Sequence, residues 1–288
     1  MRGYTGLTTF NRSQDLEAMR ASFQADGAIF VTDFLSPSLC TSLSHTVKAM
    51  AGSHAAGGQD PRRFWRYFHG ERTKRFTGIG RHTEAFFDLL EDPLFGHLAD
   101  QALGDGGPHY WMNTCQAMII GPGEPAQVLH RDGQNWTTVQ SALWPKCPEL
   151  TVSMMIALDG VWPELGATRV VPHSHRWLDY DRRPAPCEIE TGSFKAGDAL
   201  FYSGSLLHGG GANETADQIR WALHLSFVVG WLTPEEAITE EYPASLVSGR
   251  SDRVKRLLGH SSFEAPPTQG GRLWLKNFDH WQQSDETH

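Results

Sequence analysis

A histidine and an aspartate stand two residues apart in the segment QVLHRDGQ, which spans residues 127–134. In an extended strand, residues i and i+2 project from the same face, so His130 and Asp132 can reach one metal ion while Arg131 points away. A second histidine would complete a two-histidine, one-carboxylate set of ligands, which is typical of non-haem Fe(II) enzymes that use oxygen. The pair therefore predicts an iron site if the chain supplies the third ligand.

His208 is the candidate for that ligand. It comes after a predicted turn and strand over residues 197–202, and it is followed by three glycines at 209–211. Glycines let the backbone turn sharply, so a ligand beside them approaches a metal without steric conflict. Of the 14 histidines, we therefore predict that His208 joins His130 and Asp132.

Three other histidines have simpler interpretations. His173 and His175 also stand two residues apart, but they lie in a polar loop without a nearby carboxylate. We interpret them as loop residues or as residues that support the ligands. His224 lies inside an expected strand, and it fits a hydrogen-bonded core or pocket histidine better than a ligand.

The elements that must position these ligands change in kind along the chain. The first third is predicted to be mostly helical, from apolar residues at helical spacing and from Gly and Pro at the expected ends. The expected elements are a helix over 13–24 ended by Gly27, a strand over 28–31, a helix opened by Ser36-Pro37, and a helical region over 84–103 that is broken or kinked at Pro93.

After residues 104–108, short β-like runs alternate with Gly and Pro turns, which predicts an antiparallel sandwich or barrel. The expected strands are 110–120, 128–131, 151–158, 168–171, 199–202 and 221–229. A C-terminal helical segment is expected at about 233–260, starting at Thr233-Pro234, and the polar tail 284–288 is expected to be frayed.

Length and charge restrict the class of protein. With 288 residues, of which 40% are hydrophobic and 20% charged, the chain fits a single domain over 1–288. A net charge of -8 argues against nucleic-acid or membrane partners, because no basic stripe would attract them. One basic cluster, between Arg62 and Arg81, is an exception and is either a solvated face or an internal anion site.

Cysteine spacing and hydropathy point to the cytoplasm. The four cysteines form no CxxC pair, so neither a disulfide framework nor a zinc knuckle is indicated, and free thiols suggest a reducing compartment. Residues 1–10 carry no apolar signal region, and no stretch approaches the ~18 to 20 apolar residues of a membrane span. We expect a soluble, cytoplasmic protein.

Four motifs in a fixed order resemble one known family. They are PAQVLHRD at 125–132, GAT at 166–168 with SHRW at 174–177, GDAL at 197–200, and HGGG at 208–211; LTP at 232–234 follows near the end. Together they resemble the phytanoyl-CoA dioxygenase-like family of Fe(II)/2-oxoglutarate-dependent oxygenases, and within it the fungal branch that makes meroterpenoids and alkaloids.

The resemblance implies a mainly β fold with flanking helices (α+β), a double-stranded β-helix also called a jelly roll or cupin-like fold. The helical third at about 13–103 would pack on a jelly-roll core at about 110–230. The resemblance also implies Fe(II) held by His130, Asp132 and His208, with 2-oxoglutarate as cosubstrate and O2 as oxidant.

A buried carboxylate of 2-oxoglutarate calls for an arginine, whose guanidinium donates two charge-assisted hydrogen bonds. Arg220, 12 residues after His208, matches the family position, while Thr168 and Gln127 offer a hydroxyl and an amide. The family's Thr-Lys-Arg motif maps onto residues 73–75, which adds Arg75 to the cosubstrate contacts, with Arg72 as an open alternative.

The expected function is oxidation of a polycyclic terpenoid or alkaloid-like molecule that begins with hydrogen-atom abstraction. Hydroxylation, desaturation, epoxidation, endoperoxidation and rearrangement are all open outcomes, and Asp132 disfavours a halogenase because an acid occupies the halide position. Substrate contacts are expected from residues 64–68, from 134–136 and around Trp231, although these rings fit core positions equally well.

Several alternatives stay open. A zinc-dependent jelly-roll isomerase or hydrolase would use the same three ligands without a cosubstrate arginine. A phytanoyl-CoA-type acyl hydroxylase and a non-enzymatic small-molecule binder are the other two. The expected partner is a small-molecule natural product, and a homodimer is possible.

Overall fold

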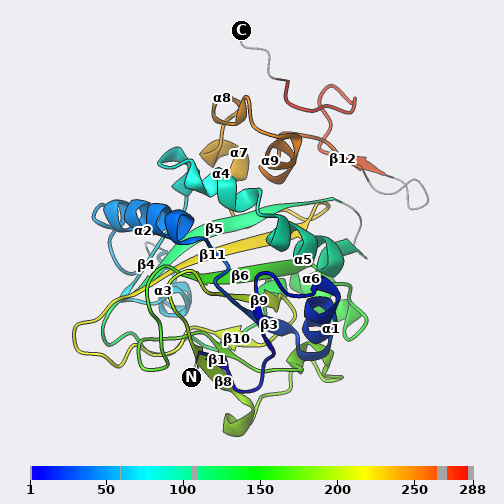
Figure 1. Ribbon diagram of the computed structural model, residues 1–288. Coiled ribbons are helices and arrows are strands. Elements are labelled where there is room, and N and C mark those ends of the chain that lie inside the picture. Colours follow the sequence, from blue (N-terminus) through cyan, green and yellow to red (C-terminus); the bar gives the residue numbers. More distant parts are fainter. Residues whose placement is uncertain (1, 59, 105–108, 265–270, 285–288) are drawn as a thin grey trace.

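The protein is built around two β-sheets that pack against each other, with helices on the outer side of the larger one (Figure 1). The computed structural model describes residues 2–58, 60–104, 109–264 and 271–284. Apolar residues from both sheets form one core cluster, to which Tyr4, Phe30 and Val170 belong. This confirms the predicted antiparallel sandwich.

Seven strands form the large sheet and four form the small one in the described part of the chain. In the order of pairing, the large sheet contains β2 (Thr9–Asn11), β3 (Ala28–Thr32), β9 (Ala199–Ser203), β6 (Thr151–Ala157), β11 (Arg220–Val229), β5 (Tyr110–Ile120) and β4 (Thr73–Phe76). The small sheet contains β1 (Gly3–Tyr4), β8 (Glu190–Ser193), β7 (Arg169–Val170) and β10 (His208–Gly209). A separate hairpin pairs β12 (Phe263–Glu264) with β13 (Arg272–Leu273).

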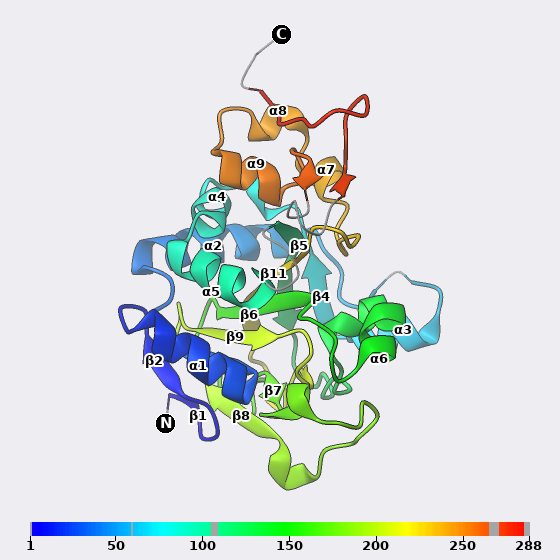
Figure 2. The same ribbon diagram turned by 90° about the vertical axis from the view of Figure 1, so that its right-hand side faces the viewer.

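Four helices cover the outer face of the large sheet, on the side where Figure 2 shows them together. They are α1 (Leu16–Asp26), α2 (Pro37–Ala51), α4 (Ala85–Leu90) and α5 (Pro93–Leu103). Two helices, α3 (Arg63–His69) and α6 (Thr137–Leu143), lie towards one end of the sandwich. Three short ones follow the last long strand: α7 (Ile238–Glu241), α8 (Ala244–Val247) and α9 (Asp252–Leu257).

Local signals fix the ends of the covering helices. The Asp15 carboxylate accepts a hydrogen bond from the backbone of Glu17 at the start of α1, and Gly27 ends that helix with φ +80°. Ser36 caps α2 ahead of Pro37 at the first helical position. Asp92 caps α5 in the same way ahead of Pro93, so the predicted break at Pro93 is confirmed.

Alternation along β11 assigns the two faces of the large sheet. Leu223, Leu225 and Phe227 point to the helices and belong to the larger core cluster. Ala222 belongs to the cluster between the sheets, and His224 follows it two residues later on the same face. The inner face is therefore the one that can present polar groups to a site.

Three sequence predictions need correction. The predicted strand over 28–31 is confirmed as β3, but the first third also supplies β1, β2 and β4 to the two sheets, which the sequence did not predict. The segment 128–131 is not a strand; only His130 forms an isolated bridge. The C-terminal helical segment begins at Ile238 rather than at Thr233, since Glu235 and Glu236 instead bond to β5.

The predictions for the C-terminal tail and for the number of domains stay predictions. Most of the tail, 285–288, lies outside the described residues, and the single domain over 1–288 stays a prediction. None of the helices formed by the described residues has the length and apolarity that a membrane span requires.

Phe95 provides a test of how the helices are held on the sheet. Its ring is fully buried and stacks on Phe227 with centroids 4.5 Å apart. Phe95→Ala should lower the free energy of unfolding by about 3–5 kcal/mol, because it leaves a cavity between α5 and β11. Urea denaturation measures this loss. Phe278→Ala, at a ring that is 82% exposed, is the control and should change stability little; equal losses would contradict the assignment.

Candidate metal and cosubstrate site

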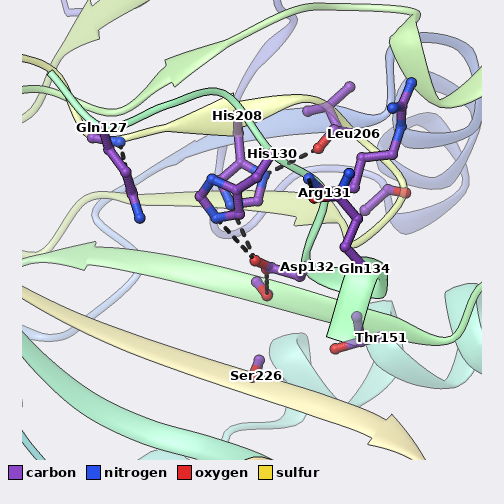
Figure 3. A network of polar contacts seen from close by, with 12 residues as sticks. Gln127, His130, Arg131, Asp132, Gln134, Thr151, Leu206, His208 and Ser226 are labelled. Carbon is purple, nitrogen blue, oxygen red and sulfur yellow. Dashed lines mark hydrogen bonds and ion pairs between the residues drawn. The ribbon is translucent and has the colours of Figure 1, made fainter. Parts of the chain in front are cut away.

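A pair of backbone hydrogen bonds joins His130 to His208. The N–H of each residue donates to the carbonyl oxygen of the other, and both N–O distances are 2.9 Å. This antiparallel bridge places the two imidazoles side by side, with ring centroids 4.6 Å apart (Figure 3). Two segments 78 residues apart in sequence are thereby fixed at the same point.

Each imidazole has one nitrogen occupied and one available. Nδ1 of His130 lies 3.0 Å from the carbonyl oxygen of Val128, and Nδ1 of His208 lies 3.0 Å from that of Leu206. If both Nδ1 atoms carry the proton and donate to these carbonyls, each Nε2 is left with its lone pair free. These Nε2 atoms lie 3.6 Å and 3.3 Å from Oδ1 of Asp132.

A hydrogen bond to Oδ2, the oxygen that does not face the histidines, orients the carboxylate of Asp132. Ser153 of β6 donates a hydrogen bond of 2.8 Å to Oδ2, so Oδ1 faces the two histidines (Figure 3). One ligand atom from each of the three residues lies within 4.8 Å of the others. The structure therefore brings together the three residues that sequence spacing selected, although Asp132 begins a 3₁₀ turn, Asp132–Trp136, instead of continuing a strand.

Arg131 points away from the histidines, as expected, and is buried behind them (Figure 3). Its guanidinium donates to the carbonyl oxygens of Ser205, Tyr180 and Ser174 at 2.9, 3.0 and 3.3 Å. It also lies over the Trp144 and Tyr180 rings, 4.8 and 4.9 Å from their centroids. The residue between two ligands thus anchors the segment to the turn that leads to His208.

That turn, residues 203–206, is hydrogen-bonded both to the segment that carries Asp132 and to the side chain of Glu149. The backbone N–H of Gly133 donates to the carbonyl oxygen of Gly204 at 3.0 Å. The hydroxyls of Ser203 and Ser205 both donate to the carboxylate of Glu149. Burial raises the pKa of Glu149 to about 7, although the two serine hydroxyls act to lower it.

The electrostatics of the three residues suit a cation. Burial and the neighbouring His208 lower the pKa of His130 to about 4, so its imidazole is neutral at pH 7. Burial acts to raise the pKa of Asp132, but the charge of protonated His208 and its hydrogen bond outweigh that effect and lower the pKa. Burial acts to lower the pKa of His208, but Asp132 raises it, so without a metal Nε2 of His208 holds a proton that a metal ion would displace. An ionised carboxylate beside free imidazole nitrogens is the donor set that a divalent transition metal requires.

A cavity of about 380 Å³ opens in front of these residues. Its floor is the inner face of the large sheet, and its rim carries the aromatic rings of α3. The floor residues are Thr73, Arg75, Thr114, Gln116, Met118, Ile120, Met155, Tyr202, Arg220 and His224, and the rim residues include Phe64, Trp65, Tyr67 and Phe68.

The predicted cosubstrate residues meet on this floor. Arg220 is buried, and its Nη2 donates 3.2 Å to the hydroxyl of Thr168, while its Nε is buried without a partner among the described residues. Arg75 donates to the side chain of Gln116 at 2.8 Å and to the backbone of His69. Burial lowers the pKa of each arginine to about 10, so both stay charged at neutral pH.

Arg72 and Gln127 differ in what they offer the cavity. Arg72 is exposed and donates to the carbonyl oxygen of Pro122, so Arg75 and not Arg72 faces the cavity. The amide of Gln127 lines the cavity, but it donates to the backbone of Phe68 at 3.2 Å and accepts from Gly210 at 3.1 Å. Its role as a donor to the cosubstrate stays a prediction.

The three glycines after His208 serve close packing rather than a sharp turn. Gly209, Gly210 and Gly211 all have negative or extended φ values. A Cβ at Gly211 would lie 2.5 Å from the backbone oxygen of Ala167. Without side chains here, β10 lies directly against the segments that carry Gln127 and Thr168.

The positions of three other histidines agree only partly with the predictions. His173 and His175 contact the backbone at the end of α1, at Ala25 and Gln24, and do not line the cavity in the described chain. His224 does line it, so it is a pocket histidine. It is not hydrogen-bonded, however, because both ring nitrogens are buried without a partner among the described residues.

Some of the residues predicted to contact the substrate line the cavity, and others do not. Four rings of the segment 64–68 and the side chains of Gln134 and Asn135 line the cavity. Trp136, which donates to the backbone of Thr233, and Trp231 are absent from its lining in the described chain. Sequence reasoning missed Glu235, which lines the cavity and accepts from Asn113 at 2.7 Å. No local pattern marks it, since only the return of the chain after β11 brings it there.

Comparison with known proteins identifies the class. The phytanoyl-CoA dioxygenase (PhyH) family matches residues 23–222, and the chain belongs to this family. Dioxygenase ALT11 of Alternaria alternata is 30% identical over 282 residues, which cover 96% of this chain and 92% of the relative. The Fe(II)/2-oxoglutarate-dependent dioxygenase nvfF of Aspergillus novofumigatus (strain IBT 16806) is 30% identical over 280 residues, covering 95% and 91%.

Solved structures agree on the fold. The epimerase SnoN, in complex with Fe3+, alpha ketoglutarate and nogalamycin RO, superimposes with a TM-score of 0.56 at 18% identity, over 74% of this chain and 83% of that one. The carbocyclase SnoK from nogalamycin biosynthesis gives the same TM-score of 0.56, over 75% and 85%. The double-stranded β-helix with flanking helices is thus confirmed.

The chain is a non-haem Fe(II)/2-oxoglutarate-dependent dioxygenase, and Fe(II), 2-oxoglutarate and O2 are its cofactor and cosubstrates. The residues present fit these groups. Two free imidazole nitrogens and a carboxylate oxygen suit Fe(II), and a buried arginine with an unpartnered Nε suits a carboxylate.

Glu149, which binds the turn at 203–206, makes the folding stability of the protein depend on pH. Its pKa of about 7 lies above the ordinary value of 4.5, so the folded protein binds an extra proton. Stability from this group is full below about pH 4.5 and falls as pH rises towards about 7. Glu149→Gln should therefore match wild type at pH 5 and exceed it by roughly 2 kcal/mol at pH 8.

Urea denaturation of metal-free protein at both pH values measures the difference. Glu71→Gln, at an exposed position, is the matched control and should show no such pH-dependent gain. A Glu149→Gln protein that is equally stabilised at pH 5 and pH 8 would show that Glu149 does not carry the proton.

Proposed function

We propose that this dioxygenase oxidises a small-molecule natural product, of terpenoid or alkaloid-like polycyclic kind, in a reaction that begins with hydrogen-atom abstraction from carbon. The observation that carries the proposal is the cavity itself. His130, Asp132 and His208 open onto a polar floor on one side and an aromatic rim on the other. One cavity thus offers separate places to a charged diacid and to an apolar molecule.

In this proposal, Nε2 of His130, Nε2 of His208 and Oδ1 of Asp132 bind the metal. Three protein ligands leave positions for 2-oxoglutarate and oxygen. When bound, Fe(II) with 2-oxoglutarate and O2 supplies the oxidising power, and the cosubstrate leaves as succinate and CO2. The protein's own contribution is to fix the ligands, exclude water and orient the substrate.

Arg220 and Thr168 hold the carboxylate of 2-oxoglutarate that lies far from the metal. Nε of Arg220 has no partner among the described residues, so it is free to donate to an incoming carboxylate. Arg75 adds a second positive charge to the same floor. Burial makes these charge-assisted hydrogen bonds strong, since water does not compete with the carboxylate.

The aromatic rim is the proposed substrate site. Phe64 and Tyr67 are 61% and 51% exposed and both line the cavity, so their rings are open to an incoming apolar molecule. Phe68 lies edge-on to His130, with centroids 4.8 Å apart, so a molecule against the rim also lies beside the metal ligands. SnoN and SnoK both come from nogalamycin biosynthesis, which supports a natural product as substrate here.

Succinate release tests the proposed function. Purified protein with Fe(II), 2-oxoglutarate and ascorbate should release succinate in step with oxidation of a member of a terpenoid and alkaloid panel. Asp132→Ala and His208→Ala should lose iron binding and reduce turnover by at least about a hundredfold, because two ligands do not hold Fe(II) in place. Iron content and succinate yield are the measurements.

The controls separate the alternatives. His45→Ala, at an exposed position on α2, should keep full activity. Turnover with Zn(II) and without 2-oxoglutarate would show a hydrolase or isomerase instead. Activity on acyl-CoA thioesters alone would show an acyl hydroxylase, and 2-oxoglutarate binding without any oxygen consumption would show a binding protein.

The rim can be tested apart from the metal. Replacing Phe64 and Tyr67 together by Ala should raise KM for the substrate found in the panel by roughly tenfold, because two apolar contacts are lost. Calorimetric affinity for 2-oxoglutarate should stay unchanged, since neither ring is on the cavity floor. Leu178→Ala, at an 84% exposed residue, is the control. An unchanged KM in the double variant would place the substrate elsewhere.

A further inference from the structure

His224 is the least explained polar side chain of the cavity. It lies near the middle of β11, is 5% exposed, and has neither Nδ1 nor Nε2 bonded to any described residue. A neutral imidazole has one donor and one acceptor, and leaving both unmade in a buried position is costly. A ring that lines a cavity in this state is suited to a ligand that the cavity receives.

Its place on the sheet shows which part of the cavity it serves. Arg220 and His224 are four residues apart on β11 and share its inner face. Two residues further along that face, Ser226 pairs with Ser153, the residue whose hydroxyl holds Asp132. His224 therefore lies between the arginine and the metal ligands.

Ring contacts place His224 close to the metal end. The Tyr202 ring is 4.5 Å from that of His208 and 6.3 Å from that of His224, between centroids. His224 is nevertheless outside the group of three whose ligand atoms lie within 4.8 Å of one another. It is near the metal ligands without belonging to them.

These positions suit one feature of 2-oxoglutarate. The molecule has two carboxylates, and the arginine with Thr168 accounts for the one far from the metal. Its keto acid end carries the other, and a neutral imidazole can donate a hydrogen bond to that carboxylate. His224 lies on the floor with the arginine, whereas the aromatic rings that are proposed to meet the substrate lie on α3.

We propose that His224 is a second anchor of 2-oxoglutarate and donates a hydrogen bond to the carboxylate that lies beside the metal. The inference rests on the proposed function, since it takes 2-oxoglutarate as the ligand of this cavity. It divides the work of β11 between two residues. Arg220 selects a diacid by its length, and His224 orients the end that meets the metal.

A truncated ligand separates the two anchors. 2-Oxobutanoate keeps the keto acid end and lacks the far carboxylate. Calorimetry with Mn(II)-loaded protein should show that His224→Phe binds both 2-oxoglutarate and 2-oxobutanoate about 10- to 100-fold more weakly, because both lose the same charge-assisted hydrogen bond. Arg220→Met should weaken 2-oxoglutarate alone.

Two further variants keep the test free of folding effects. His224→Gln retains an amide N–H and should recover part of the affinity for both ligands, while His224→Leu is a second apolar replacement if His224→Phe unfolds. Mn(II) affinity and the melting temperature are measured for each variant. His45→Ala on α2 is the matched histidine control and should bind both ligands as wild type does.

The other outcomes overturn the inference. Unchanged affinity for both ligands would show that His224 touches neither. A loss for 2-oxoglutarate alone would place His224 at the far carboxylate, and a loss of Mn(II) affinity would make it part of the metal site. If wild-type protein itself binds no 2-oxoglutarate, the proposed function fails, which is a different result from failure at His224.

Discussion

The two backbone hydrogen bonds between His130 and His208 are the constraint on which the site depends. Neither histidine lies in a long strand, so side-chain geometry alone would not keep them together. The bridge fixes the distance between their imidazoles, and the carbonyls of Val128 and Leu206 fix which nitrogen each ring presents. A carboxylate oxygen placed near both Nε2 atoms, as Oδ1 of Asp132 is, then completes a metal site.

The packing behind the bridge explains why it is held. Arg131 cannot reach water, so its guanidinium must find partners in the protein, and it finds carbonyl oxygens at Ser205 and Ser174. Glu149 holds the same turn from the other side through two serine hydroxyls. A buried guanidinium on one side of the turn and a buried carboxyl group on the other are costly to leave without hydrogen-bond partners, so movement of either ligand segment would leave a polar group unpaired.

The features that could be predicted from the sequence are those that depend on local sequence patterns. The covering helices, the long strands β5, β6 and β11, and the His-x-Asp pair all follow from periodicity, capping residues and spacing. It did not find β1, β2 or β4, because strands of two to four residues are defined by distant partners rather than by their own composition. Glu235 and the unpaired state of His224 were missed for the same reason, since both depend on which strands lie beside them.

The two surfaces of the cavity differ in how firmly they are held, and this difference bears on specificity. Most floor residues project from β5, β6, β9 and β11, whose backbones are bonded on both sides, so their positions are fixed by sheet register; Thr73 and Arg75 project from the edge strand β4, which pairs with β5. The rim is α3, a seven-residue helix that, within the described chain, has no side-chain N-cap and no buried residue. Its rings can therefore shift against a substrate at little cost, while the floor cannot adapt to another cosubstrate. A fixed floor with an adaptable rim lets one fold keep its oxidative chemistry constant while the molecule it oxidises varies.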